Sequence, residues 1–359
     1  MNDQAIYILS IFDPTNYGNR LQACALEATV ASISSKEVIS IDSRRPKRKR
    51  GFVKCLADLR RTMIELRKIS PARRRLFGSF QRNWCARVVE VPEDEISHID
   101  GPIVIGSDQC WNPSWGLGSC EFGAQCASGV ERKVAYAASF GIRLQDMPTS
   151  WRERYAVWLN EIDRIGVREF AGAEIVRALT TVEAKVVLDP TMLMKAEWWA
   201  KLEKRPCIKH VDLGCGFCLK YVLGNDESSA AIAQRCAREG LELIDLTDPH
   251  LAVGPSEFVW LVHHSSLVCT DSFHATVFSL LFHKRFVVYE RRGNATNMSS
   301  RFDTLDELFG IDGNRSCLSS FNEGAVDNRD WNLFEQRLET YRLDSLSWLR
   351  ESLKMIQGL

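Results

Sequence analysis

The chain has 359 residues, enough for two domains of ordinary size, and 45% of them are hydrophobic, enough for a substantial core. Its 46 basic and 46 acidic side chains balance, which argues against a general binder of polyanions. No apolar run reaches membrane-spanning length, and the N-terminus lacks a signal-type segment. We therefore expect a cytoplasmic protein.

Twelve cysteines are scattered along the chain, several of them in apolar segments. Buried thiols in a reducing compartment explain this distribution better than a disulfide framework. One Cys-x-x-Cys pair occurs, Cys215 and Cys218, but no second pair of cysteines or histidines follows at zinc spacing. We interpret the pair as core packing and expect no metal site.

The first half of the chain, residues 1–190, alternates strand-like and helix-like runs. The expected strands are 5–11, 38–41, 102–105, 133–137, 163–167 and 184–188, and the expected helices are 21–32, 147–161 and 170–179. This alternation is typical of a parallel sheet covered by helices, and it predicts a Rossmann-like domain.

A polar segment joins the first strand to the first helix. In it, Gly18 lets the backbone turn tightly and approach a ligand, while Asn16, Tyr17 and Asn19 supply polar groups. The segment has neither the P-loop nor the G-x-G-x-x-G spacing, so nucleotide binding is not indicated here. A loop that only joins strand to helix is the alternative.

From Arg44 to Arg82 the sequence has fifteen basic residues and two acidic ones, with apolar residues at helical spacing. This pattern predicts a basic helical insertion, residues 44–87, made of one or two amphipathic helices. The insertion would attract an anionic partner, and the favoured one is the inner membrane surface or a lipid-linked acceptor. We do not expect nucleic acid as a partner. The alternative is a solvated face balanced by acids elsewhere.

Polar side chains also follow two later strands of the first half. Asp108 and Gln109 come after residues 102–105, beside Trp111, and aromatic faces next to polar groups are how proteins hold sugars. Asp108 is the acid best placed to activate a hydroxyl. Arg168 follows residues 163–167, and its planar fork suits a carboxylate or phosphate. The alternatives are tryptophans that cover the sheet edge and a structural ion pair.

The alternation restarts after a linker at residues 191–210. The second domain, residues 211–330, has expected strands at 217–223, 241–246, 267–270 and 286–289, and expected helices at 227–239, 255–263, 275–282 and 301–308. A final segment, residues 331–359, contains an amphipathic helix at 331–357 that we expect to pack back across both domains.

The unit built on residues 265–290 organises the second domain. Its strand ends in a polar turn in which Asp271 or Ser272 can cap the next helix. His274 then falls at the carboxyl edge of the sheet, where ligands bind and where helix N–H groups attract anions. There it can hydrogen-bond an anion or shuttle a proton, unless it only completes the cap.

A second helix start carries similar features. Ser300 and Asp303 resemble a capping box, and Arg301 lies at the beginning of the helix. Taken together, the polar residues at strand ends and helix starts fit two Rossmann-like domains facing across a cleft. They suit an enzyme that handles an anionic small molecule and a hydroxylated one.

Seven segments occur here in a characteristic order: NYGNRLQA, GSDQCWNP, VAYAASFG, VREFAG, VVLDPTMLM, TDSFHATVFSLLFHKRFV and SSRFDTLDELFG. Over residues 16–310 this ordered set resembles the polysaccharide pyruvyl transferase family. The resemblance implies an α/β fold of the glycosyltransferase-B-like kind, with phosphoenolpyruvate as co-substrate and no other cofactor. It also implies transfer to two hydroxyls of a sugar in a bacterial glycan, free or lipid-linked, which gives a cyclic pyruvate ketal and phosphate.

The resemblance assigns roles to the matching residues. His274 and Asp108 would be catalytic. The donor-binding residues would be Arg168, Arg301, Ser272 and Ser300, and the acceptor-binding residues would be Asn16, Tyr17, Asn19, Gln109 and Trp111.

One position departs from the family pattern. Many members have Arg-Leu-His where this chain has Ser272-Phe273-His274, so one positive charge near the donor is missing. Either Arg301 or another arginine supplies it, or the donor differs. The remaining alternatives are a nucleotide-sugar-dependent glycosyltransferase and a non-catalytic protein that binds anions, nucleic acid or membranes.

Overall fold

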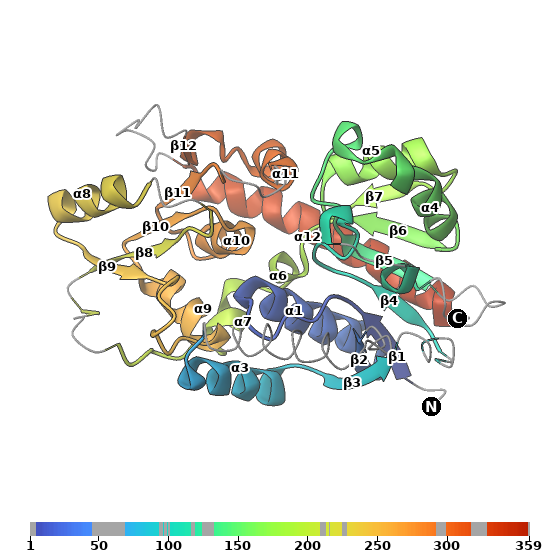
Figure 1. Cartoon of the computed structure of the whole chain (residues 1–359), viewed down its shortest axis with the longest axis horizontal. Coiled ribbons are helices and arrows are strands. Elements are labelled where there is room, and N and C mark those ends of the chain that lie inside the picture. Colours follow the sequence, from blue (N-terminus) through green and yellow to red (C-terminus); the bar gives the residue numbers. More distant parts are fainter. Residues whose placement is uncertain are drawn as a thin grey trace, which may run out of the picture.

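The computed structural model describes residues 5–44, 69–92, 96, 99, 101–115, 119–123, 133–208, 213–214, 216–224, 228–291, 299–316 and 329–357. Two separate sheets organise these residues (Figure 1), and every strand pairing in both is parallel. The predicted α/β architecture with two Rossmann-like halves is therefore confirmed.

The first sheet has the strand order β3-β2-β1-β4-β5-β6-β7 within the described residues. Its strands are β1 (Ala5–Leu9), β2 (Glu37–Arg44), β3 (Arg87–Pro92), β4 (Ile103–Ile105), β5 (Lys133–Ala138), β6 (Arg164–Val167) and β7 (Ala184–Val186). The order reverses between β1 and β4, so their carboxyl ends flank a crevice of the kind that binds ligands in open α/β sheets. The edge strand β3 was not predicted, although Val88, Val89 and Val91 are typical strand residues.

The second sheet has the order β12-β11-β10-β8-β9. Its strands are β8 (Phe217–Tyr221), β9 (Glu242–Asp245), β10 (Leu267–Thr270), β11 (Phe286–Tyr289) and β12 (Arg315–Ser316). Strands β8, β10 and β11 are buried over their whole length. Strands buried on both faces are mostly apolar, as these are apart from Lys220 and Thr270, which is why the sequence predicted them.

Helices cover both sheets. They are α1 (Tyr17–Ser34), α3 (Pro71–Trp84), α4 (Thr149–Leu159), α5 (Phe170–Leu179), α6 (Pro190–Leu193), α7 (Ala196–Ala200), α8 (Ser229–Glu239), α9 (Pro255–His264), α10 (Phe273–Leu281), α11 (Ser300–Phe309) and α12 (Trp331–Gln357). The predicted bounds of α5 and α12 agree with the structure. The expected linker, residues 191–210, contains part of α6 and all of α7.

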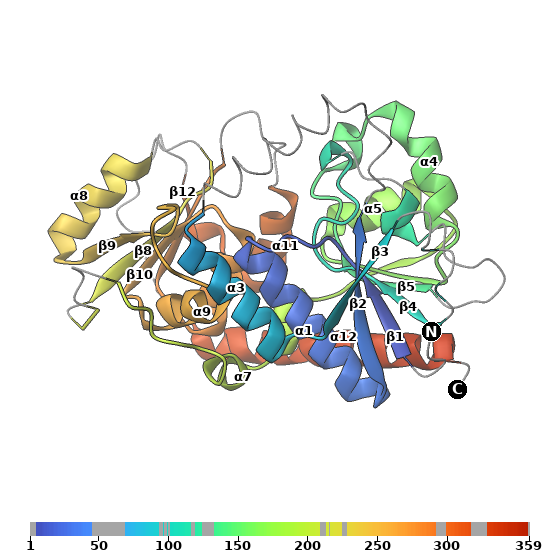
Figure 2. The ribbon, with the colours of Figure 1, turned by 60° about the horizontal axis from the view of Figure 1, so that its bottom comes forward.

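Helix α12 packs back across the molecule, as predicted. It contacts α11, α6, α1 and β5, and Figure 2 shows it running along both groups of strands. Trp348 packs on Tyr136 of β5 with ring centroids 6.2 Å apart, and the Ser345 hydroxyl accepts a hydrogen bond from the Leu188 N–H at 3.0 Å. One helix thus joins the two halves.

The start of α1 also joins the two halves. The sequence predicts a loop at residues 13–20, but the helix begins at Tyr17, because the Asn16 side chain caps it by accepting from the Asn19 N–H at 3.1 Å. The Tyr17 ring is fully buried and stacks on Phe258 of α9 at 4.9 Å. Its hydroxyl donates to the Val253 carbonyl at 3.2 Å.

Three other sequence observations concern different parts of the chain. Most of the basic insertion, residues 45–68, lies outside the described residues, and α3 is its described part. Cys218 is buried in β8 as expected, while Cys215 lies outside the described residues. Within the described chain, no helix combines the length and the apolar character needed to cross a lipid bilayer.

Candidate active site

Charged side chains gather where the carboxyl ends of β4, β6 and β7 meet the starts of α1, α10 and α11. Four of the residues in this cluster were predicted from the sequence: Asp108, Arg168, His274 and Arg301. All four are buried. Because they come from both halves of the chain, the cluster forms only when the two halves are packed together.

Asp108 occupies an unusual backbone position after β4. Its φ of 69° lies in the left-handed region, and Gly106 two residues earlier has φ 119°. A Cβ at Gly106 would lie 2.3 Å from the Tyr136 carbonyl oxygen, so only glycine fits there. Asp108 pairs with Ala138 in an isolated bridge, and its carbonyl accepts from the Ser139 N–H at 2.9 Å. Backbone contacts with the neighbouring β5 therefore fix the position of the Asp108 backbone.

Arg168 joins two buried carboxylates. Its Nη1 donates to Asp189 Oδ2 at 2.7 Å and its Nη2 donates to Asp108 Oδ1 at 3.3 Å. Its Nε has no hydrogen-bond partner among the described residues. Asp108 also accepts from the Asn19 side-chain amide at 3.0 Å. Burial alone would raise the pKa of Asp108, but Arg168 and then His274 outweigh burial and lower that pKa.

His274 lies between Asp189 and Gly18. Its Nε2 is 3.5 Å from Asp189 Oδ2, and burial is again outweighed, first by His274 and then by Arg168, so that the pKa of Asp189 is lowered. On the other side, a Cβ built on Gly18 would lie 2.1 Å from His274 Nδ1. Gly18 is therefore required by the close approach of His274 and not, as the sequence suggested, by a turn.

Arg301 completes the cluster from α11. Its guanidinium carbon lies 5.3 Å from the ring centroid of Phe273, and that of Arg168 lies 4.8 Å from the same centroid. With the Gln109 amide oxygen facing Arg301, this oxygen accepts from Nη1 at 2.9 Å and from Nη2 at 2.8 Å. Burial and then the neighbouring Arg168 lower the pKa of Arg301, since two guanidinium groups lie close together in a dry site.

The helix starts beside the cluster are not capped in the predicted way. Ser272 is the N-cap residue of α10 but its side chain makes no capping hydrogen bond, and Asp271 instead accepts from the N–H groups of Leu223 and Gly224, each at 2.8 Å. The predicted capping box of Ser300 and Asp303 is wrong. Helix α11 begins at Ser300, and Asp303 pairs with Arg143 and Arg315.

A cavity of about 570 Å³ opens between α5 and α11. Its lining includes Arg143, Arg152, Phe170, Ser300 and Thr304, from both halves of the chain. The Ser300 side chain is buried, and its hydroxyl has no hydrogen-bond partner among the described residues. Since Arg301 follows Ser300 and Arg168 lies two residues before Phe170, the cavity adjoins the charged cluster.

The predicted acceptor-binding residues do not all meet in one place. Asn19 and Gln109 belong to the charged cluster, where they contact Asp108 and Arg301. Asn16 is exposed as the cap of α1. Tyr17 lies in the aromatic core, and Trp111 is fully buried, stacked on Phe122 with centroids 5.1 Å apart. Trp111 is thus part of the hydrophobic core that packs on the first sheet.

Two members of the cluster were missed by the sequence reasoning. Asp189 directly follows the expected strand 184–188 and was given no role, yet it caps α6 by accepting from the Thr191 N–H at 2.9 Å and contacts both Arg168 and His274. The signal was the Asp-Pro pair at a predicted strand end, because proline favours the first position of a helix. Phe273 was treated as part of a departure from a motif, but its ring contacts both guanidinium groups.

These features define an α/β protein of two parallel sheets with a buried arginine, histidine and aspartate site at the joint between its halves. The family model for polysaccharide pyruvyl transferase matches residues 16–292, more than half of the chain. The chain belongs to the polysaccharide pyruvyl transferase family. No curated protein matches it.

Solved structures similar in shape come from several bacteria. A UDP-N-acetylglucosamine 2-epimerase from Rickettsia bellii has a TM-score of 0.49 at 10% identity and covers 98% of each chain. A structure described as a putative UDP-N-acetylglucosamine 2-epimerase from Listeria monocytogenes has a TM-score of 0.44 at 11% sequence identity. The match covers 99% of this chain and 91% of that chain. The E. coli heptosyltransferase WaaC with ADP has a TM-score of 0.41 at 9% sequence identity, and the match covers 94% of this chain and 99% of that chain.

Proposed function

We propose that the protein transfers the pyruvate group of phosphoenolpyruvate to two hydroxyls of a sugar and forms a cyclic ketal. Family membership supports the transferase class. The observation that carries the finer proposal is the convergence of Arg168, Arg301 and His274 around Phe273 and Asp108. A small dianion or trianion needs such a set of cationic and hydrogen-bonding groups.

The donor would be held mainly by groups of the second half. The start of α10 presents N–H groups that no side chain caps, and helix N-termini favour anions. In our proposal Arg301 supplies the positive charge that the family pattern places at Ser272, since its guanidinium lies over the neighbouring Phe273 ring. Arg168 already donates to two aspartates, and its Nε has no partner among the described residues. The Nε–H and the second hydrogen on each terminal nitrogen therefore remain for the donor.

His274 would transfer the proton. A proton added to the methylene carbon of phosphoenolpyruvate leaves a cation at the neighbouring carbon, one sugar hydroxyl attacks that carbon, phosphate leaves, and a second hydroxyl closes the ring. Of the two hydroxyl protons, one restores the proton that His274 gave to carbon, and the other leaves with phosphate. The lowered pKa of Asp108 keeps it ionised, so it can accept a proton but is a poor donor. His274, beside Asp189, is the better proton donor.

The acceptor would enter the cavity between α5 and α11. This cavity mixes arginine, glutamate, serine and threonine side chains, and sugar hydroxyls need both donors and acceptors. The Ser300 hydroxyl and the pair Arg143–Asp303, joined at 2.7 Å, line it from both halves. A volume of about 570 Å³ suits one or two sugar rings.

Incubation of the purified protein with radiolabelled phosphoenolpyruvate and a panel of glycan acceptors tests the proposal. We expect phosphate release that depends on an acceptor, with label in an acid-labile ketal product. Turnover only with nucleotide sugars would make the protein a glycosyltransferase. Salt-sensitive binding of anions with no turnover, unchanged by His274→Ala and Arg301→Gln, would make it a binding protein.

A further inference from the structure

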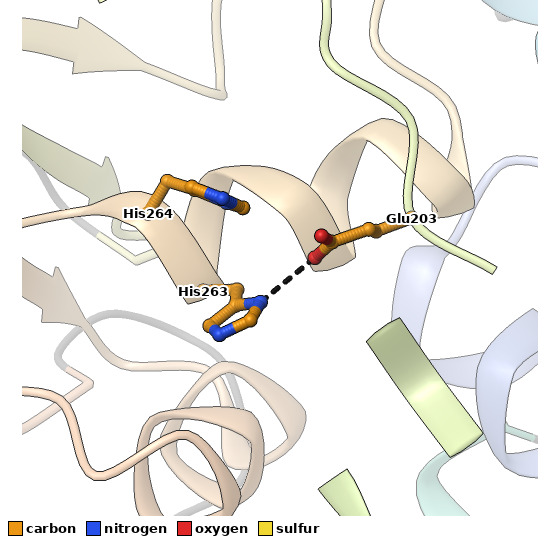
Figure 3. Close-up of side chains that lie close together, drawn as sticks. All are labelled: Glu203, His263 and His264. Atoms are coloured by element: carbon orange, nitrogen blue, oxygen red, sulfur yellow. Dashed lines mark hydrogen bonds and ion pairs between the residues drawn. The ribbon is translucent and has the colours of Figure 1, made fainter. Parts of the chain in front are cut away.

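A group of metal-ligating side chains lies apart from the residues of the charged cluster. Glu203 follows α7, and His263 and His264 are the last two residues of α9. Each offers one ligand atom, and these three atoms all lie within 4.8 Å of one another. In Figure 3 both imidazoles project from the end of α9 on the side where the Glu203 carboxylate approaches.

We propose that Glu203, His263 and His264 form a binding site for a transition-metal ion of the zinc type. Two imidazole nitrogens and one carboxylate oxygen are the donor set that Zn²⁺ and its neighbours prefer, and three protein ligands leave one position for water. Ca²⁺ and Mg²⁺ prefer oxygen ligands alone, so this set discriminates against them.

The rings are held in place before any ion arrives. The His263 ring stacks on Phe282 and the His264 ring stacks on Trp260, each with centroids 4.2 Å apart. His264 Nδ1 lies 3.0 Å from the Trp260 carbonyl oxygen, and a ring nitrogen that donates to a carbonyl leaves the other nitrogen as the metal ligand. The surroundings therefore favour one tautomer and one approximate orientation of His264.

The electrostatics of this position favour a cation. Both histidines belong to the last turn of α9, where the helix dipole places partial negative charge. His263 Nδ1 already lies 2.8 Å from Glu203 Oε2, in the ion pair drawn in Figure 3. Around a tetrahedral ion the ligand atoms would lie about 3.4 Å apart. The difference from the observed limit of 4.8 Å is about 1.4 Å at most. Small side-chain rotations can close it, because Glu203 and His263 are only partly buried and His264 is exposed.

Such an ion would join two parts of the chain. Glu203 belongs to the segment that leads from α7 toward β8, and the Lys204 N–H of this segment already donates to the Ser256 carbonyl at the start of α9. A bound ion would strengthen the attachment that Glu203 and His263 already make at the other end of α9. We expect it to stabilise the fold, since a ligand that binds only the folded state shifts the unfolding equilibrium.

Titration of the chelator-treated full chain with zinc chloride, followed by calorimetry, tests the site. We expect one equivalent of Zn²⁺ to bind and to raise the unfolding temperature, and CaCl₂ to do neither. The exposed His264 is the variant of choice, because His264→Ala should fold normally yet weaken zinc binding at least about tenfold, as should Glu203→Gln. Cobalt chloride should give tetrahedral absorption bands that His264→Ala abolishes.

The chain offers a matched control. His283 and Glu335 form a similar pair at 2.7 Å without a third ligand among the described residues. His283→Ala should leave zinc affinity unchanged. The proposal is overturned if zinc does not bind up to millimolar concentration, if His264→Ala binds it as tightly as the unchanged chain, or if His283→Ala weakens it equally.

Discussion

The two sides of the charged cluster differ in how far their hydrogen-bonding capacity is used. On the side of the first sheet, Asp108 and Asp189 each accept several hydrogen bonds, and Arg168 lies between them. On the side of the second sheet, α10 and α11 begin without side-chain caps, and the Ser300 hydroxyl has no partner among the described residues. If the proposed function holds, we infer that the first-sheet side mainly maintains the structure and that the second-sheet side binds the substrate.

Replacing His274 should separate catalysis from structural support most sharply. We expect His274→Ala to lower kcat by about 10²- to 10⁴-fold, the usual contribution of a proton-transfer residue, while the protein stays folded. Product formation and thermal unfolding measure the two effects. His283→Ala, just beyond the C-terminus of α10, is the control and should retain activity. Equal activity of both variants would remove His274 from the mechanism.

The two arginines should behave in opposite ways. Arg168→Gln leaves two buried carboxylates without their cation, and we expect it to cost about 3–5 kcal/mol of the free energy of unfolding. Arg301→Gln should cost little stability, because burial already disfavours its charge, but it should raise KM for phosphoenolpyruvate. Urea unfolding measures the stability of both variants, and steady-state kinetics measures their KM for phosphoenolpyruvate. A stable Arg168→Gln protein would contradict the proposed division.

The first-sheet side should also control stability in acid. The pKa of Asp189 is lowered in the folded state, so its stabilisation is complete above the unfolded pKa of about 3.9 and is lost as the pH falls toward the folded pKa. Between pH 5 and pH 3 the unchanged protein should therefore lose more stability than Asp189→Asn. The control is Asp344→Asn, at an exposed ion pair with Lys185. If Asp189→Asn and the unchanged protein lose stability in parallel, Asp189 is not the titrating group.

A substitution at Gly18 tests the close contact between α1 and His274 of α10. Alanine favours a helix over glycine by about 1 kcal/mol, yet a Cβ here would clash with His274. We expect Gly18→Ala to lower kcat about tenfold and to bring no gain in stability. Gly78 is the matched helical control, since a Cβ there meets only the flexible end of Arg82 at 3.3 Å, and Gly78→Ala should raise the unfolding temperature. A fully active Gly18→Ala would mean that His274 moves freely.

The fold was predictable because buried parallel strands and amphipathic helices leave a periodic record, as in β10, β11 and α12. The residues of the charged cluster could be located where polar side chains follow such strands, as Asp108 and Arg168 do, while their roles stay predictions. What the sequence did not show were contacts between distant segments. Asp189 and Phe273 gain their importance from partners in other elements, and Tyr17 and Trp111 are polar-tipped aromatics whose burial depends on packing. Glu203 lies 60 residues before His263, so its place beside the two histidines was equally hidden.

The path of α12 has a consequence for synthesis. Tyr136 of β5 is translated well before Trp348 of α12, whose ring packs on it. Until α12 emerges, this face of the first sheet lacks its cover, and the partners of Phe334, Leu338 and Leu349 lack theirs. Domains usually fold as units as they emerge, but here the first sheet can complete its packing only after α12 has been made.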